Sequence, residues 1–221
     1  MKSRESYHLR LSAFPFTLYK NIKVHFMNKD KRSKKIVAVL HCLINHNARD
    51  LGAAKYSGIN NDVLDVLKRH NVGLLQMPCP EMDYLGLART RAASLSIRDA
   101  LDTPDGRARC QELARSVADA IEEYRRYGCS VLAVLGGDVE SPGCAIPPPT
   151  KDNKDISGTD YGVFTKALHD ELEQRDIHIP FRGVRDSARK TLQEDIEWLD
   201  NFLSGKPKMN KNQRLFRRKR I

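Results

Sequence analysis

The sequence predicts an α/β fold: an open, mostly parallel sheet with helices on both faces, in the three-layer Rossmann or flavodoxin arrangement. Two observations predict it. Short, continuous apolar runs alternate along the chain with segments of helical periodicity. The apolar runs lack polar residues at alternate positions, which is typical of strands that helices cover on both faces.

Four apolar runs are expected to form the strands. They are "KIVAVLHC" at 35–42, "NVGLLQMPCP" at 71–80, "SVLAVLGG" at 130–137 and "IHIPFRGVR" at 177–185. The first is expected to end at Cys42 and the second at Cys79. Pro78 and Pro80 cannot continue a central ladder, so the second strand stops there.

Helices are expected between and after these strands. The predicted helices are 61–70, 105–127, a segment carrying Tyr161, Phe164, Leu168 and Leu172, and 187–203. Ser157 or Thr159 is a candidate cap for the third of them. One face of 105–127 is apolar and carries Cys110, Leu113, Val117, Ala120, Ile121 and Tyr124. Residues 82–104 have no clear period, and "LGLARTR" within them is expected to be a loop.

Charge divides the 221 residues into three parts. Residues 1–36 carry a net charge of +8, residues 206–221 carry +8, and the remainder carries −6. We therefore expect a basic N-terminal extension (1–35), a single α/β domain (36–205) and a basic tail (206–221). Met27 precedes the first predicted strand and is a candidate start of translation. The basic ends are either solvated segments or contacts for nucleic acid.

The chain has neither an apolar run long enough for a membrane span nor a recognisable secretory signal. Its five cysteines are an odd number and include no Cys-x-x-Cys pair, which argues against a disulfide framework or a zinc ribbon. We expect a cytoplasmic protein with reduced thiols.

Three of the cysteines follow three different strands. Cys42 and Cys79 lie at the ends of the first two strands, and Cys144 lies in the loop after the third. Parallel strands end at one edge of the sheet, where open α/β sheets bind ligands, so these thiols are expected to converge. Cys110 and Cys129, on a helix face and at a strand start, are expected to be small buried apolar residues.

Three convergent thiols indicate a soft metal or cluster. Sulfur ligands favour iron–sulfur clusters, zinc or Cu(I). A structural zinc needs a fourth ligand, for which His41 and His46 are the nearest candidates. A [4Fe–4S] cluster held by three cysteines would leave one iron open to a small ligand.

Three short motifs, each after a predicted strand, follow one another in order. They are "HCLIN" at 41–45, "QMPCPE" at 76–81 and "SPGCA" at 141–145. Together they resemble the motifs of the 2-thiouracil desulfurase family. They are closer still to its desulfidase relatives, in which the first motif runs Cys-x-x-Asn. The resemblance covers about residues 36–146, half of the chain.

The resemblance implies a cofactor and a reaction. Cys42, Cys79 and Cys144 match the cysteines that hold a [4Fe–4S] cluster, whose fourth iron has no protein ligand. A thiolated substrate binds that iron through sulfur, water replaces the sulfur on carbon, and sulfide leaves without net redox change. Glu81 matches the glutamate of the family's Cys-Pro-Glu motif and Ser141 the first serine of its Ser-Pro-x-Cys motif. These two are implied to handle protons.

Each further site residue has a functional and a structural interpretation. Hydrolysis of a C=S group needs a base for water and a proton donor, and Glu81 is the candidate base. Its alternative is a helix-capping or salt-bridging carboxylate. Ser141 is a hydrogen-bond donor or a turn residue, and Asn45 positions substrate or braces the first loop. Arg89 binds a substrate anion or lies on the surface.

The motifs also depart from the family. The third commonly reads Ser-Pro-Ser-Cys-Gly, where this chain has Gly143 and Ala145. Thiouracil desulfurases carry glycine in the first motif where this chain has Asn45. The cluster is therefore better supported than thiouracil as the substrate.

The sequence thus predicts a [4Fe–4S]-dependent desulfidase that removes sulfur from a small thiolated compound. One rival is an RNA-associated protein that binds RNA, thiolated RNA included, through its basic ends. Another is a non-catalytic module that uses the cluster as a redox or sulfur-carrier site.

Overall fold

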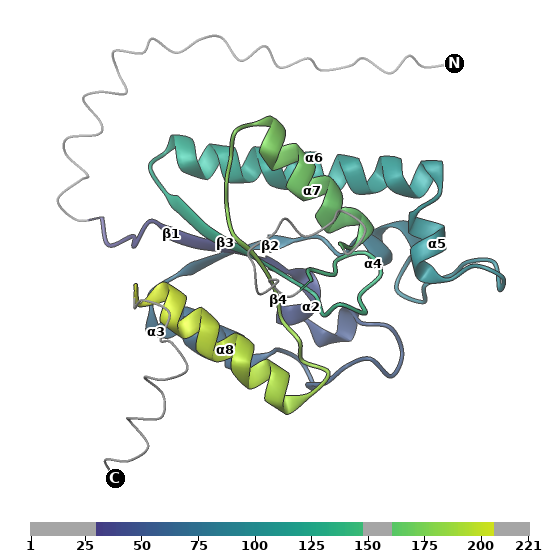
Figure 1. Cartoon of the computed structure of the whole chain (residues 1–221), viewed down its shortest axis with the longest axis horizontal. Coiled ribbons are helices and arrows are strands. Elements are labelled where there is room, and N and C mark those ends of the chain that lie inside the picture. Colours follow the sequence, from purple (N-terminus) through teal and green to yellow (C-terminus); the bar gives the residue numbers. More distant parts are fainter. Residues whose placement is uncertain (1–29, 148–160, 206–221) are drawn as a thin grey trace, which may run out of the picture. The chain divides into compact units, whose positions relative to one another are not determined.

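The computed structural model describes residues 30–147 and 161–205 (Figure 1). The chain divides into two units, residues 1–32 and 33–221, and nearly all of the first lies outside the described residues. The basic tail 206–221 and the candidate caps Ser157 and Thr159 also lie outside them.

Strands and helices alternate along the described chain, as expected. The strands are β1 (Lys35–Leu40), β2 (Gly73–Met77), β3 (Ser130–Gly136) and β4 (Phe181–Gly183). The helices are α2 (His41–Ile44), the 3₁₀ turn η2 (His46–Ala48), α3 (Asn61–Arg69), α4 (Pro80–Leu85), α5 (Ile97–Leu101), α6 (Pro104–Arg126), α7 (Val163–Gln174) and α8 (Arg189–Leu203).

The four strands form one parallel sheet in the order β2-β1-β3-β4. Ile36 of β1 pairs with Gly73 of β2 and with Val131 of β3, so β1 is central. The chain moves outward from β1 to β2 and then returns across β1 to β3. This reversal is the switch point at which doubly wound sheets bind ligands, and the order is that of a flavodoxin-like sheet without its fifth strand. The predicted fold class is confirmed.

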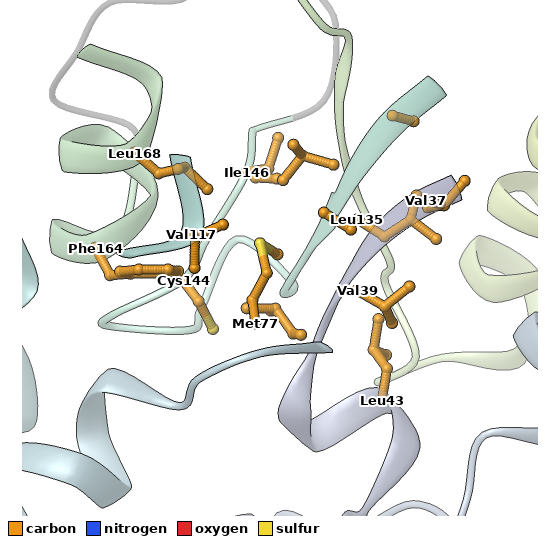
Figure 2. Packing of buried hydrophobic residues seen from close by; sticks show 14 of the residues in the cluster. Val37, Val39, Leu43, Met77, Val117, Leu135, Cys144, Ile146, Phe164 and Leu168 are labelled. Atoms are coloured by element: carbon orange, nitrogen blue, oxygen red, sulfur yellow. The ribbon is translucent and has the colours of Figure 1, made fainter. Parts of the chain in front are cut away.

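Helices cover both faces of the sheet (Figure 1). Helices α6 and α7 pack together on one side, and α3 and α8 pack together on the other. Because both faces are covered, successive residues Val37 to Leu40 of β1 are all buried. Figure 2 shows the apolar core between these layers, with Phe164 and Leu168 of α7 among its buried side chains.

Some elements and residues lie elsewhere in the structure than the sequence predicts. Residues 82–104 include most of α4 and all of α5, whose Ser96–Asp99 capping box was not recognised. Tyr124 is expected on the buried face of α6, but it is 41% exposed in the last turn of this helix, where no residue is buried. Cys129, expected to be buried at the start of a strand, is half-buried and directly precedes β3.

The structure also bears on a membrane role. None of the helices in residues 30–147 and 161–205 combines the length and the apolar character needed to cross a bilayer.

Candidate functional site

Cys42 lies just beyond the end of β1. The strand ends at Leu40, two residues earlier than expected, and Cys42 lies in the short helix α2. Asn45 ends this helix, where its backbone N–H donates to the His41 carbonyl at 2.9 Å. The Asn45 side chain accepts from the Asn47 N–H at 3.2 Å. Asn45 therefore braces the first loop, which is one of its two predicted roles.

Cys79 caps the helix that follows β2. The strand ends at Met77, and Pro80 occupies the first turn of α4, where a missing N–H costs nothing. The Cys79 sulfur accepts the Met82 N–H at 3.4 Å. Burial raises the pKa of Cys79 to about 11, although this N–H opposes the shift.

Cys144 is placed by a loop that folds back on its own strand. The Gly137 N–H donates to the Cys144 carbonyl at 2.8 Å, and the Ile146 N–H donates to the Gly137 carbonyl at 3.3 Å. A Cβ on Gly137 would lie 2.6 Å from the Ser141 hydroxyl and 3.0 Å from the Cys144 sulfur. Glycine at 137 therefore leaves the space into which Ser141 and Cys144 fold. Figure 2 shows Cys144 among the buried core residues.

The structure brings Cys42, Cys79 and Cys144 together, and we call them the thiol cluster. Interaction with the neighbouring Cys144 thiol lowers the pKa of Cys42. The same interaction, together with burial, raises the pKa of Cys144 well above its usual value. Cys79 is near enough to both for their charges to interact. The three thiols are thus neighbours at one edge of the sheet, and their joint role as ligands stays a prediction.

Glu81 links Arg89 to the loop that carries Cys144. One Glu81 oxygen accepts the Gly143 N–H at 3.3 Å, and the other accepts the Arg89 Nε–H at 3.4 Å. Both bonds are long, and a carboxylate has about four acceptor positions, so Glu81 keeps capacity for a further proton donor. The salt-bridging role predicted as its alternative is thus present. This role leaves acceptor positions of the Glu81 carboxylate unused.

Arg89 is not a surface residue, which corrects one of the two expectations for it. It is 2% exposed, and its guanidinium donates to the Ala48 carbonyl at 2.6 Å and the Gly86 carbonyl at 3.0 Å. Its Nη2 lies 3.7 Å from the Cys79 sulfur. Its backbone has a φ of +51°, which is uncommon for a residue other than glycine. In this conformation the buried Arg89 guanidinium connects the loop after β1 to the loop after β2.

Sequence reasoning missed a second arginine beside the thiols. Arg49 forms a two-pronged ion pair with Asp186, with distances of 3.0 and 2.6 Å. Its positive charge favours ionised Cys42 and thereby helps to lower the pKa of that thiol. Asp186 follows β4 at the same sheet edge. Extending the strand-end rule from the three cysteines to the fourth strand would have pointed to it.

The donor set decides which metal group the site suits. Within residues 30–147 and 161–205, no three His, Cys, Asp or Glu side chains are placed to hold a single metal ion. Cysteines that hold an iron–sulfur cluster bind different irons, so they need not converge on one point. Three soft thiols from separate loops, flanked by two arginines, fit such a cluster better than a lone zinc ion.

Gly162 gives a test of how the third loop is held. A Cβ at this position would lie 2.3 Å from the Cys144 nitrogen and 2.4 Å from the Gly143 carbonyl carbon, and backbone atoms cannot rotate away. We expect Gly162→Ala to lower the free energy of unfolding by about 1–3 kcal/mol, as overpacking does. Denaturant titration measures this. Gly58→Ala is the matched control, because nothing lies within 4 Å of its added Cβ. Equal stability of the two variants would contradict this account.

Comparison with known proteins gives a match over part of the chain. The chain is 30% identical over 95 residues to an uncharacterized protein of Methanocaldococcus jannaschii. The match covers 43% of this chain and 58% of that protein. No protein-family model matches the chain, and no solved structure matches it. The match supports no particular activity.

Proposed function

We propose that this chain binds a [4Fe–4S] cluster through Cys42, Cys79 and Cys144 and hydrolyses a C–S bond of a small thiolated compound. The observation that carries the proposal is the meeting of three thiols, from three adjacent strands, at the switch point of the sheet. The "HCLIN", "QMPCPE" and "SPGCA" motifs, with their resemblance to the 2-thiouracil desulfurase family, support it from the sequence.

When bound, such a cluster supplies an iron without a protein ligand, a Lewis acid that grips sulfur. The chain's own residues then have distinct tasks. Glu81, held by Arg89 and the Gly143 N–H, accepts a proton from the attacking water. The Ser141 hydroxyl, packed over Gly137 beside Cys144, donates a hydrogen bond toward the reacting groups. Overall, water supplies oxygen to carbon, and sulfur departs as hydrosulfide with a proton released.

The test is sulfide release by the full chain after anaerobic loading with iron and sulfide. We expect the loaded chain to release one sulfide for each molecule of a thioamide such as 2-thiouracil that it converts to the oxygen analogue. Product analysis by mass spectrometry in ¹⁸O-labelled water follows the incoming oxygen. A loaded chain that releases no sulfide from any thioamide would favour the carrier role and contradict the catalytic one.

A further inference from the structure

The strongest unassigned feature is the ion pair between Arg49 and Asp186, which joins the loop after β1 to the loop after β4. The pair is well shielded from water: 15% of the Arg49 side chain and 4% of the Asp186 side chain are exposed. The two terminal nitrogens of Arg49 face the two oxygens of Asp186 at 3.0 and 2.6 Å. Such a fork fixes the plane of the guanidinium as well as its position.

The loop that carries Asp186 is itself anchored to α8. The Arg185 N–H and Nε both donate to one oxygen of Asp195 at 2.9 Å. Arg182 of β4 donates to the other oxygen at 2.6 Å. Asp195 is 2% exposed, so the acceptor at the centre of this network is buried. Arg49 is consequently held at a fixed place by contacts that reach as far as α8.

Two buried N–H groups at this pair are unused. Neither Arg49 Nε nor His46 Nε2 has a hydrogen-bond partner within residues 30–147 and 161–205. The Lys55 N–H donates to His46 Nδ1 at 3.3 Å, which places the proton of the neutral ring on Nε2. His46 Nε2 lies 3.8 Å from the nearer Asp186 oxygen, too far for a hydrogen bond, and the His46 side chain is fully buried. Buried donors left without partners are costly and indicate a missing acceptor.

Arg49 also lies near the thiol cluster. Arg49 lies close enough to Cys42 and Cys144 for its charge to interact with both. Asp186 and Glu81 are the acidic groups that also act on Cys42. Because Asp186 engages only the terminal nitrogens, the Nε–H of Arg49 is left without an acceptor among the described residues.

We propose that Arg49, positioned by Asp186 and backed by His46, binds a sulfur anion at the thiol cluster: the substrate in its thiolate form and the hydrosulfide that leaves. The identity of this anion rests on the proposed function, whereas the cationic site rests on the ion pair and the two unused donors. Arg89 is excluded from this task because Glu81 and three backbone carbonyls already engage its nitrogens.

The iron-free chain tests the cationic site. The measured quantity is the rate of Cys42 alkylation by anionic iodoacetate divided by the rate with neutral iodoacetamide at the same pH. Both reagents react with the thiolate, so the fraction of Cys42 in the thiolate form cancels in this ratio. The ratio therefore reports the electrostatic potential at Cys42. Peptide mapping by mass spectrometry isolates Cys42. We expect Arg49→Gln to lower this ratio about fivefold and Arg49→Lys to retain most of it. Arg69→Gln, which removes an equal charge from the far end of α3, is the matched control.

Arg49→Gln leaves Asp186 buried without its cation, so we pair it with Arg49→Gln/Asp186→Asn, which restores neutrality. A fall in the ratio is expected in both, and it is smaller in the double variant because the opposing charge of Asp186 is removed as well. An unchanged ratio in the double variant would overturn the inference, whether or not the chain binds iron.

The iron-loaded chain tests the nature of the anion. Titration with sodium hydrosulfide, followed by the visible spectrum, is expected to show about tenfold weaker binding in Arg49→Gln/Asp186→Asn than in the unaltered chain. Equal affinity would overturn the assignment of sulfur as the ligand. A chain that takes up no iron would overturn the proposed function and, with it, this assignment, while the alkylation ratio would still decide whether Arg49 makes a cationic site.

Discussion

Alanine in place of any one of Cys42, Cys79 and Cys144 is expected to abolish stable cluster binding. The unaltered chain should take up about four irons and four sulfides after anaerobic reconstitution, as a [4Fe–4S] protein does. Each variant removes the ligand supplied by one loop, and no other cysteine lies at this edge among the described residues to replace it. Iron and acid-labile sulfide assays, with the visible absorption band, measure the loss.

Cys110→Ala is the matched control for these variants. Cys110 lies on the buried face of α6, and burial raises its pKa to about 12, so it behaves as an apolar side chain. We expect Cys110→Ala to bind iron as the unaltered chain does. If all four variants bind iron equally, or if the unaltered chain binds no iron, the three thiols do not form an iron–sulfur site.

The convergence of the three thiols could be predicted because it depends only on topology. Apolar runs locate the strands, and parallel strands share one carboxyl edge. A position directly after a strand is therefore fixed in space to within the length of a short loop. The prediction was wrong about the backbone at Cys42, which lies in α2 and not in β1. It still placed Cys42 at the correct edge of the sheet.

The two arginines could not be placed by this reasoning. Arg49 and Asp186 are 137 residues apart, and their pairing depends on how the loops after β1 and β4 fold over the edge. Arg89 is buried because carbonyls of two loops surround it, which no periodicity reveals. Charged residues are mostly exposed, so a surface position was the reasonable expectation from the sequence. Tertiary hydrogen bonds stabilise Arg89 in a buried position instead.

Glutamine in place of Glu81 is expected to lower the rate of sulfide release about 10²–10⁴-fold, the usual contribution of a general base. The amide retains an oxygen that can accept the Gly143 N–H or the Arg89 Nε–H, so the loop contact at 3.3 Å or that at 3.4 Å can persist. It cannot take a proton from water. Iron content and the thermal midpoint of unfolding should therefore stay near those of the unaltered chain.

Glu140→Gln separates this effect from a general loss of negative charge. Glu140 is exposed and precedes Ser141 in the loop after β3, so it is close in sequence to the site yet open to solvent. We expect its rate of sulfide release to remain within about twofold of the unaltered chain, since exposed charges are strongly screened. A Glu81→Gln chain that keeps its iron and its rate would assign Glu81 to the ion pair with Arg89 alone. The base would then have to be sought elsewhere at this edge of the sheet.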